Sequence, residues 1–308
     1  MQKIDSVLKK ARKNDMINYI KKRGKDMKTG LVLEGGGFRG IYTAGVLDVF
    51  LENGISFDGV IGVSAGTAHG CSFLSSQKGR SIDYYTKYCN DPRFMSFKNF
   101  LKTGNIVGVQ FVYHDLPEKL VPYDYEAFKA QKSEFFVTVS NLESGEAEYV
   151  KINDMHTDID YLRASASLPY FSRIVKLDNK KYLDGGCCDG IPIKAFREMG
   201  YKRNVIVLTR HDGFVKKQEH GLFAKWKYRK YPKFVDALLA LHERYNKTLE
   251  YIRELERSGE VFVIRPSEEL TIGRTEQDVE KVKRVYDIGV RDAEQQVEKL
   301  KKWLDKTV

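Results

Sequence analysis

Residues 30–66 read GLVLEGGGFRGIYTAGVLDVFLENGISFDGVIGVSAG, and this stretch decides the fold. A short apolar run at 31–33 predicts a buried strand, and a glycine-rich segment separates it from a helical pattern over 41–51. Gly54 ends this helix, and residues 60–63 form a second apolar run. Strands that alternate with helices in this way are typical of a mainly parallel sheet with helices on both faces. The stretch therefore predicts the α/β class.

The second predicted strand ends in GVSAG at 62–66. Gly62, Ser64 and Gly66 fit the GxSxG pattern, in which a serine lies on a sharp strand-to-helix turn with its hydroxyl above the sheet. Glycines beside the serine allow neighbouring backbone to approach closely. So short a motif also fits a tight turn with an incidental serine. Because an apolar run precedes it and small residues follow, we interpret Ser64 as a candidate nucleophile.

The segment GGGFRG at 35–40 lies between the first predicted strand and its helix. Successive backbone N–H groups at the start of a helix form an anion site. In acyl transfer such a site stabilises the oxyanion of the tetrahedral intermediate. The segment therefore predicts an oxyanion hole built from Gly35, Gly36, Gly37, Arg39 and Gly40. Arg39 either adds positive charge there or anchors the loop.

The same six residues also fit the GxGxxG motif, so a Rossmann-type nucleotide-binding oxidoreductase is an alternative. Asp58 follows Gly40 by eighteen positions, close to the spacing of the acidic residue that binds a ribose in such folds. That residue should end the second strand. Asp58 instead precedes the predicted strand at 60–63, and Ser64 ends it, which favours the hydrolase interpretation.

A candidate general base comes much later, in the segment DGG at 184–186. An Asp acts as a base near neutral pH when it stays ionised and partial desolvation makes it more basic. Asp184 followed by Gly185 and Gly186 also fits an ordinary turn.

A Ser-His-Asp triad of the α/β-hydrolase type is a second alternative. Its chain order is satisfied by three histidines after Asp184, namely His211, His220 and His242. None has surroundings typical of a catalytic base, and His211, at the end of a predicted strand, is the best of the three.

The chain has 308 residues and a formal net charge of +10, concentrated in two blocks. Residues 1–30 hold ten Lys and Arg against three Asp, a net of +7, and residues 197–233 hold eleven against three acidic residues, a net of +8. Such blocks favour anionic partners, although solvated surfaces also carry them. Neither block has a helix-turn-helix, RRM or zinc pattern, so no nucleic acid is expected. Peripheral contact with an anionic membrane is the hypothesis that remains.

The cysteines and the apolar runs bear on the compartment. Four cysteines, Cys71, Cys89, Cys187 and Cys188, form no CxxC pair, which argues against a zinc or redox motif and favours a reduced, cytoplasmic compartment. There is no run of about 18 apolar residues, so no membrane-spanning helix is predicted.

The rest of the chain predicts further strands and helices. We expect a hairpin from 135–140 and 147–152, strands at 204–209 and 260–264, and long helices at 234–256 and 276–303. The pattern in 92–125 predicts no regular element. We expect a cover there, whose aromatic residues between 94 and 113 line an acyl-chain pocket.

Taken in order, GGGFRG at 35–40, GVSAG at 62–66 and DGG at 184–186 resemble the motifs of the patatin-like phospholipase family. Residues 164–169, ASASLP, resemble that family's segment upstream of its catalytic aspartate. The resemblance implies a three-layer α/β/α sandwich with a mainly parallel central sheet. It also implies that Ser64 is the nucleophile, that Asp184 is its direct base without a histidine, and that the glycine-rich loop is the oxyanion hole.

By the same resemblance the protein is a serine lipid acyl hydrolase that cleaves a fatty acyl ester through an acyl-enzyme, with no metal or cofactor. Its substrate would be a phospholipid or related lipid ester. The chain then divides into a basic helical extension at 1–28, a catalytic core at 29–210, and a C-terminal α/β segment at 211–308 that completes or flanks the same domain.

Overall fold

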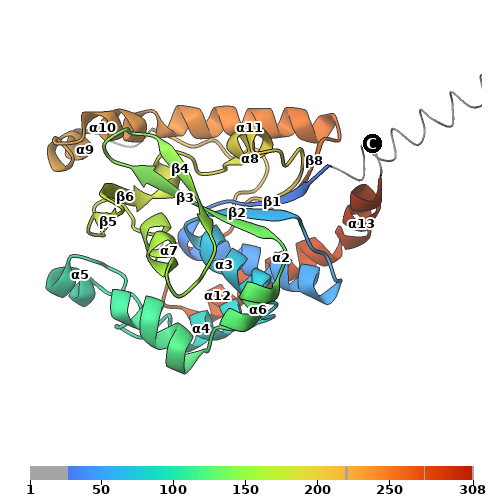
Figure 1. Ribbon diagram of the computed structural model, residues 1–308, viewed down its shortest axis with the longest axis horizontal. Coiled ribbons are helices and arrows are strands. Elements are labelled where there is room, and N and C mark those ends of the chain that lie inside the picture. Colours follow the sequence, from blue (N-terminus) through green and yellow to red (C-terminus); the bar gives the residue numbers. More distant parts are fainter. Residues whose placement is uncertain (1–26, 219–220, 274, 307–308) are drawn as a thin grey trace, which may run out of the picture.

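The computed structural model of the chain describes residues 27–218, 221–273 and 275–306. The basic helix expected over 1–28 lies almost wholly outside these residues. Within them, one mainly parallel sheet of eight strands lies between two layers of helices (Figure 1). The predicted three-layer α/β/α sandwich is therefore confirmed.

The strands are β1 (Thr29–Leu33), β2 (Gly59–Val63), β3 (Glu134–Asn141), β4 (Ala147–Ile152), β5 (Val175–Leu177), β6 (Lys180–Asp184), β7 (Arg203–Val207) and β8 (Val261–Ile264). Their order is β5-β6-β3-β2-β1-β7-β8, with β4 paired to β3 off this path. The strands from β3 through β8 in this order are parallel, whereas β4, β5 and β6 pair antiparallel with their neighbours. Leu33 pairs with Gly62, so the carboxyl ends of β1 and β2 lie side by side.

The helices are α2 (Ile41–Glu52), α3 (Ala65–Leu74), α4 (Arg80–Tyr88), α5 (Phe97–Thr103), α6 (Tyr125–Ala130), α7 (Ile159–Ser165), α8 (Ile193–Glu198), α9 (Leu222–Lys227), α10 (Pro232–Leu239), α11 (Leu241–Arg257), α12 (Val279–Glu294) and α13 (Val297–Asp305). Short 3-10 helices are η1 (Gly37–Gly40) and η3 (Gly185–Cys187), and η2 (Phe111–Leu120) is a π-helix.

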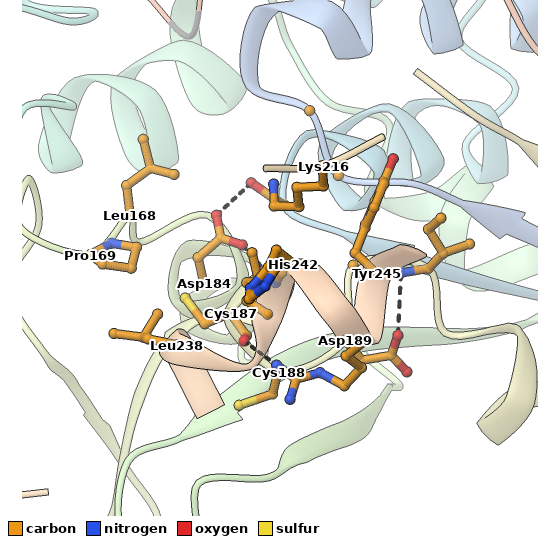
Figure 2. A pocket seen from close by; sticks show the side chains of 18 of the residues that line it. Leu168, Pro169, Asp184, Cys187, Cys188, Asp189, Lys216, Leu238, His242 and Tyr245 are labelled. Carbon is orange, nitrogen blue, oxygen red and sulfur yellow. Dashed lines mark hydrogen bonds between the residues drawn. The ribbon is translucent and has the colours of Figure 1, made fainter. Parts of the chain in front are cut away.

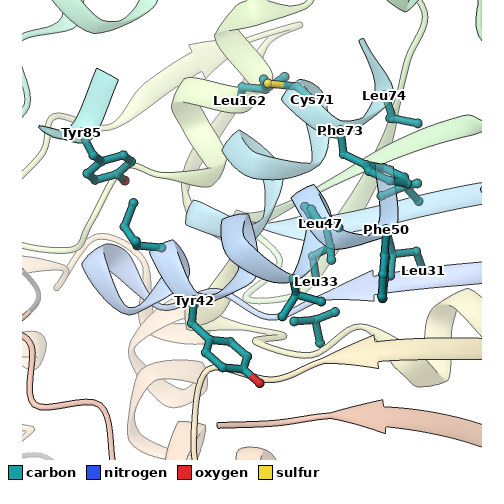
Figure 3. Close-up of a cluster of buried hydrophobic side chains, with 14 of the residues drawn as sticks. Leu31, Leu33, Tyr42, Leu47, Phe50, Cys71, Phe73, Leu74, Tyr85 and Leu162 are labelled. Atoms are coloured by element: carbon teal, nitrogen blue, oxygen red, sulfur yellow. The ribbon is translucent and has the colours of Figure 1, made fainter. Parts of the chain in front are cut away.

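Successive side chains of β1 pack against opposite layers of helices, because side chains alternate between the two faces of a sheet. Leu31 and Leu33 belong to the large cluster that α2, α3 and α12 cover, and Figure 3 shows both beside Leu47 and Phe50 of α2. Val32 belongs instead to the cluster under α8 and α11. The strand is therefore buried on both faces, as its unbroken apolar run predicts.

Both predicted long helices are interrupted. The helix expected at 234–256 is divided at Ala240 into α10 and α11, and the one expected at 276–303 is divided between Glu294 and Val297. α10 and α11 bury their apolar faces in different clusters. Periodicity alone shows an apolar stripe but does not show which surface covers it.

The region 92–125 contains α5 and the π-helix η2, which the sequence pattern did not predict. Phe94 and Phe111 are buried here, whereas α5 has no buried residue at all. Among the described residues, no helix has the length and apolar character needed to cross a bilayer.

Candidate active site

Ser64 lies at the turn between β2 and α3, where the backbone is strained. Its φ of 53° and ψ of −119° fall in a region that non-glycine residues rarely occupy, at a cost of about 1–3 kcal/mol. Gly66, two positions after Ser64, is required by packing, because a Cβ there would lie 2.5 Å from the carbonyl oxygen of Leu33. The turn thus holds Ser64 beside the end of β1, at the edge where ligands bind parallel sheets.

Asp184 reaches Ser64 across β3, the strand that lies between β6 and β2. It ends β6, which pairs antiparallel with β3. Ser64 Oγ donates a hydrogen bond of 2.8 Å to Asp184 Oδ2, and the Gly186 N–H donates one of 2.8 Å to Asp184 Oδ1. Both side chains are almost fully buried. The serine hydroxyl therefore has a carboxylate as its direct acceptor.

Ser165 fixes the backbone of this turn. Its hydroxyl accepts the N–H of Ser64 at 2.9 Å and donates to the carbonyl oxygen of Thr138 at 2.7 Å. It is fully buried at the end of α7 and so ties the turn to β3. Ser165 lies within ASASLP, but the sequence indicated no role for it. The hydrogen bond from Ser64 joins residues 101 positions apart, and such a bond leaves no local signal in the sequence.

The glycine-rich loop lies opposite this pair. Gly35 donates its N–H to the Gly190 carbonyl, at 3.4 Å. The N–H groups of Gly36 and Gly37 have no hydrogen-bond acceptor within the described part of the chain. A Cβ on Gly36 would lie 2.8 Å from Thr209 Oγ1, so this position has no room for a side chain. Two unused donors therefore border the space beside Ser64.

One cavity of about 250 Å³ joins these elements. The predicted residues that line it are Gly35, Gly36, Gly37, Arg39, Ser64, Asp184 and Gly186. The other predicted glycines, Gly40, Gly62, Gly66 and Gly185, do not line it and instead occupy close backbone or side-chain contacts. The sequence motifs thus contain both groups that face the cavity and groups that allow the chain to pack around it.

The wall of this cavity that faces the glycine loop is formed by residues that belong to none of the sequence motifs. They include Arg210, Lys216, His242, Arg244 and Tyr245. In Figure 2, Leu168, Pro169 and Leu238 lie to one side of Asp184, and Lys216 and Tyr245 lie to the other. One side of the cavity is therefore apolar and the other carries positive charge.

Glu34 connects this wall to the glycine loop. It is buried directly before Gly35, where its Oε1 accepts the hydroxyl of Tyr245 and its Oε2 accepts the N–H of Thr209, each at 2.5 Å. Burial raises the pKa of Glu34, although these two hydrogen bonds and the charge of Arg39 oppose the shift. Tyr245 belongs to α11, so the C-terminal part of the chain helps to hold the loop.

A second cavity, of about 150 Å³, meets the first at Ser64, Gly37 and Leu168. Its walls are mainly apolar and include Phe94 and Tyr113 from the region 92–125, together with Ala68, Leu116 and Leu162. The aromatic residues expected to line a pocket therefore do so in part, whereas Phe97 is exposed. Ser64 lies where the first cavity, with its apolar and its charged side, joins a second, mainly apolar cavity.

Asp58 does not meet the requirements of the nucleotide-binding alternative. It precedes β2, and its Oδ2 accepts the N–H and the hydroxyl of Thr29 at the start of β1. Asp58 therefore lies at the amino ends of these parallel strands, and the glycine loop lies at their carboxyl ends. A ribose-binding acid must lie at the same edge as the loop.

The histidines of the triad alternative lie in different places. His211 does not line the described cavity and contacts the ring of Phe214. His242 does line it, with its Nδ1 3.1 Å from the carbonyl oxygen of Leu239. His220 lies outside the described residues. In a triad an imidazole lies between the serine and the carboxylate, whereas here Ser64 and Asp184 are in direct contact.

Two known proteins are similar to this chain, one in sequence and one in structure. A protein of Escherichia coli K12, described as uncharacterized protein YjjU, is 30% identical over 185 residues, which are 59% of this chain and 52% of that protein. The match thus spans about half the length of this curated relative. The crystal structure of VipD from Legionella pneumophila is similar with a TM-score of 0.45 and 14% identity, over 89% of this chain and 67% of that one.

Two family models match separate parts of the chain. One, described as a domain of unknown function (DUF6363), matches residues 231–305, the part that contains α11 and Tyr245. The other, described as patatin-like phospholipase, matches residues 31–197, which is more than half of the chain and includes the glycine loop, Ser64 and Asp184. The chain belongs to the patatin-like phospholipase family.

Proposed function

We propose that the chain is a serine lipid acyl hydrolase that acts on carboxylic esters through Ser64 and Asp184. The observation that carries the proposal is the hydrogen bond of 2.8 Å from Ser64 Oγ to Asp184 Oδ2 beside two unused backbone donors. A nucleophile, its base and an oxyanion site are the three parts that acyl transfer requires. Family membership supports the same chemistry in general.

In the proposed reaction Asp184 Oδ2 accepts the proton of Ser64 as Oγ attacks the ester carbonyl carbon. The carbonyl oxygen takes the negative charge and accepts the N–H groups of Gly36 and Gly37. Collapse of this intermediate breaks the bond to the leaving oxygen, which receives the proton from Asp184, and leaves an acyl group on Ser64. Water then repeats the sequence, with Asp184 as its base, and releases the fatty acid.

The two cavities divide the proposed substrate. The apolar cavity is the place for the acyl chain, because its walls offer carbon atoms and aromatic faces to methylene groups. The charged side of the first cavity holds Arg210, Lys216 and Arg244 and is the place for the alcohol part of the ester. This division supports a lipid ester, phospholipid or related lipid, as the substrate class.

The proposal includes the setting of the enzyme. A net charge of +8 over residues 197–233 supports peripheral contact with an anionic membrane. All four cysteines are free and buried, which supports a reducing, cytoplasmic compartment.

Hydrolysis of a water-soluble short-chain p-nitrophenyl ester tests the proposal. Ser64→Ala and Asp184→Asn should each lower kcat by a factor of about a thousand or more, because each removes a group that acts in the transition state. Ser167→Ala is the matched control, since the Ser167 hydroxyl bonds within its own turn to the Arg163 carbonyl. Full activity in either dyad variant would overturn the assignment.

A further inference from the structure

Six large apolar side chains are exposed on two short helices and the segment between the cavities. We call them the apolar rim; they are Phe97, Leu101, Phe171, Leu222, Phe223 and Trp226. Leu222 is 83% exposed, Leu101 72%, Phe97 65% and Trp226 62%. Figure 1 shows α5 and α9, which carry most of the rim, at the same end of the molecule. Contiguous exposed apolar surface of this kind marks an interaction site.

The α9 half of the rim is held rigidly. Ala224 and Tyr228 face inward and are buried, and the Tyr228 hydroxyl accepts the N–H of Tyr170 at 2.9 Å. On the outer face the rings of Phe223 and Trp226 stack with centroids 5.7 Å apart. The fold therefore presents these rings to solvent on an anchored helix.

Ring contacts continue toward the α5 half. Phe223 lies 5.0 Å from Tyr170, ring centroid to ring centroid. The next residue, Phe171, lies 6.1 Å from Phe100 of α5, which in turn lies 5.9 Å from Phe97. Ring contacts thus lead from each helix to the segment after Pro169, which lies between the two halves of the rim.

The rim borders the active-site cavities. Phe223 and Ala224 line the first cavity, which contains Ser64, as does Pro169. Leu168, one residue earlier, lines both cavities. A lipid molecule that leaves a membrane bound at the rim therefore has a short path to Ser64.

Positive charge accompanies the rim. Exposed lysines on the two helices and directly after α9 are Lys98, Lys102, Lys225, Lys227 and Lys230. None of the five forms an ion pair with any residue that the structure describes. Over residues 213–235 the sequence holds seven Lys and Arg against one Glu. Aromatic and leucine side chains flanked by lysines match the interface of an anionic bilayer, where apolar groups enter the acyl boundary and lysines meet headgroups.

We propose that the apolar rim and its lysines dock the protein on an anionic lipid bilayer, with the rim side of the Ser64 cavity facing the lipid. The rim inserts among the headgroups, and the lysines supply the preference for negative charge. The inference rests on the proposed function for the purpose of docking, but the binding itself needs no catalysis.

Trp226 reports insertion directly. The chain has two tryptophans, and Trp303→Phe leaves Trp226 as the single indole. Combined with Ser64→Ala, which prevents lipid turnover, this variant is mixed with vesicles of phosphatidylcholine alone or with added phosphatidylglycerol. The anionic vesicles should shift Trp226 emission to shorter wavelength and sediment the protein, and high salt should weaken both effects because it screens the lysines. Unchanged emission and no sedimentation would overturn the proposal.

Single substitutions distinguish the contribution of the rim's apolar side chains to membrane binding from that of charge alone. Leu222→Ser and Leu101→Ser should each weaken vesicle affinity by about tenfold, because each removes an inserted apolar side chain. Met199→Ser is the matched control, since Met199 is also exposed but lies after α8, and it should bind as the parent does. Equal affinity of Leu222→Ser and the parent would contradict insertion.

Two further readings distinguish this proposal from its rivals. If light scattering shows a dimer that Leu222→Ser converts to a monomer, the rim is a contact between copies and the proposal fails.

Leu222→Ser should hydrolyse a water-soluble ester at the parent rate and lose activity on anionic vesicles. Vesicle binding without any esterase activity would contradict the proposed function and support the docking surface. Esterase activity without vesicle binding would contradict the docking surface and support the proposed function.

Discussion

Glu34 is a carboxylate buried where the glycine loop begins, and its two acceptor oxygens are both used. The Tyr245 hydroxyl and the Thr209 N–H stabilise its charge, whereas burial raises its pKa. We infer that this pair of bonds sets the position of the loop, and so of the Gly36 and Gly37 donors. Tyr245 is then a positioning residue that touches no reacting atom.

Tyr245→Phe tests this role. It should lower kcat on a soluble ester several-fold with little change in KM, and lower the free energy of unfolding by about 1–3 kcal/mol because a buried acceptor loses its donor. Burial holds the pKa of Glu34 above its unfolded value, and the loss of a donor to the carboxylate should raise the pKa of Glu34 in the fold further. The loss of unfolding free energy should therefore grow as the pH rises through the pKa of Glu34 in the fold. A loss that does not change with pH in a series of urea unfolding measurements would contradict this role.

Ser165→Ala tests the support of the strained turn. The Ser64 N–H loses its acceptor and the Thr138 carbonyl loses its donor, both in the interior. We expect about 1–3 kcal/mol less unfolding free energy and a lower kcat, because Ser64 is no longer held against Asp184. Ser165→Thr retains the hydroxyl and should restore part of kcat. An unchanged kcat in Ser165→Ala would remove the positioning role.

At the scale of elements, α2 and α12 cross in unusually close contact. A Cβ on Gly289 of α12 would lie 2.1 Å from the Tyr42 carbonyl oxygen of α2, and a Cβ on Gly45 would lie 2.3 Å from that of Tyr286. Gly289→Ala should therefore lower the unfolding free energy by about 1–3 kcal/mol despite alanine's better helix propensity. Urea unfolding measures this change, and a midpoint equal to the parent's would show that the helices separate without cost.

Elements with a local signal were predicted from sequence, and contacts between distant elements were not. The runs at 31–33 and 60–63 predicted β1 and β2 because a doubly buried strand has no polar residue to interrupt it. The division of α10 from α11 depends on which cluster each helix covers, and that is a property of the assembled fold. For the same reason the motifs indicated Ser64, Asp184 and the loop, whereas Glu34 and Tyr245 had no motif. Ser165 lies within ASASLP, but the sequence indicated no role for it.

At the scale of the molecule, we propose that residues 211–308 belong to one folding unit with the core. β8 extends the sheet beside β7, α12 packs on α2, and Tyr245 reaches Glu34. Calorimetry should then show one cooperative transition with equal calorimetric and van't Hoff enthalpies. Two resolved transitions would mean that the C-terminal part is a separate domain.

If the acyl chain occupies the apolar cavity, a change in that cavity should alter activity on long acyl esters and not on short ones. Ala68→Leu places extra carbon atoms in the apolar cavity, which Ala68 lines one turn after Ser64. Excluding about two methylene groups of the substrate should lower kcat/KM for long acyl esters by about tenfold and leave acetyl esters unaffected. A uniform loss across chain lengths would place the acyl chain elsewhere.

Covalent labelling shows whether Asp184 activates Ser64 as a nucleophile. The folded protein is treated with a fluorophosphonate, which reacts with activated serines, and the adduct is located by mass spectrometry. We expect one adduct, on Ser64, that forms much more slowly in Asp184→Asn and at the parent rate in Ser167→Ala. Labelling of another serine, or labelling of Ser64 that does not depend on Asp184, would contradict it.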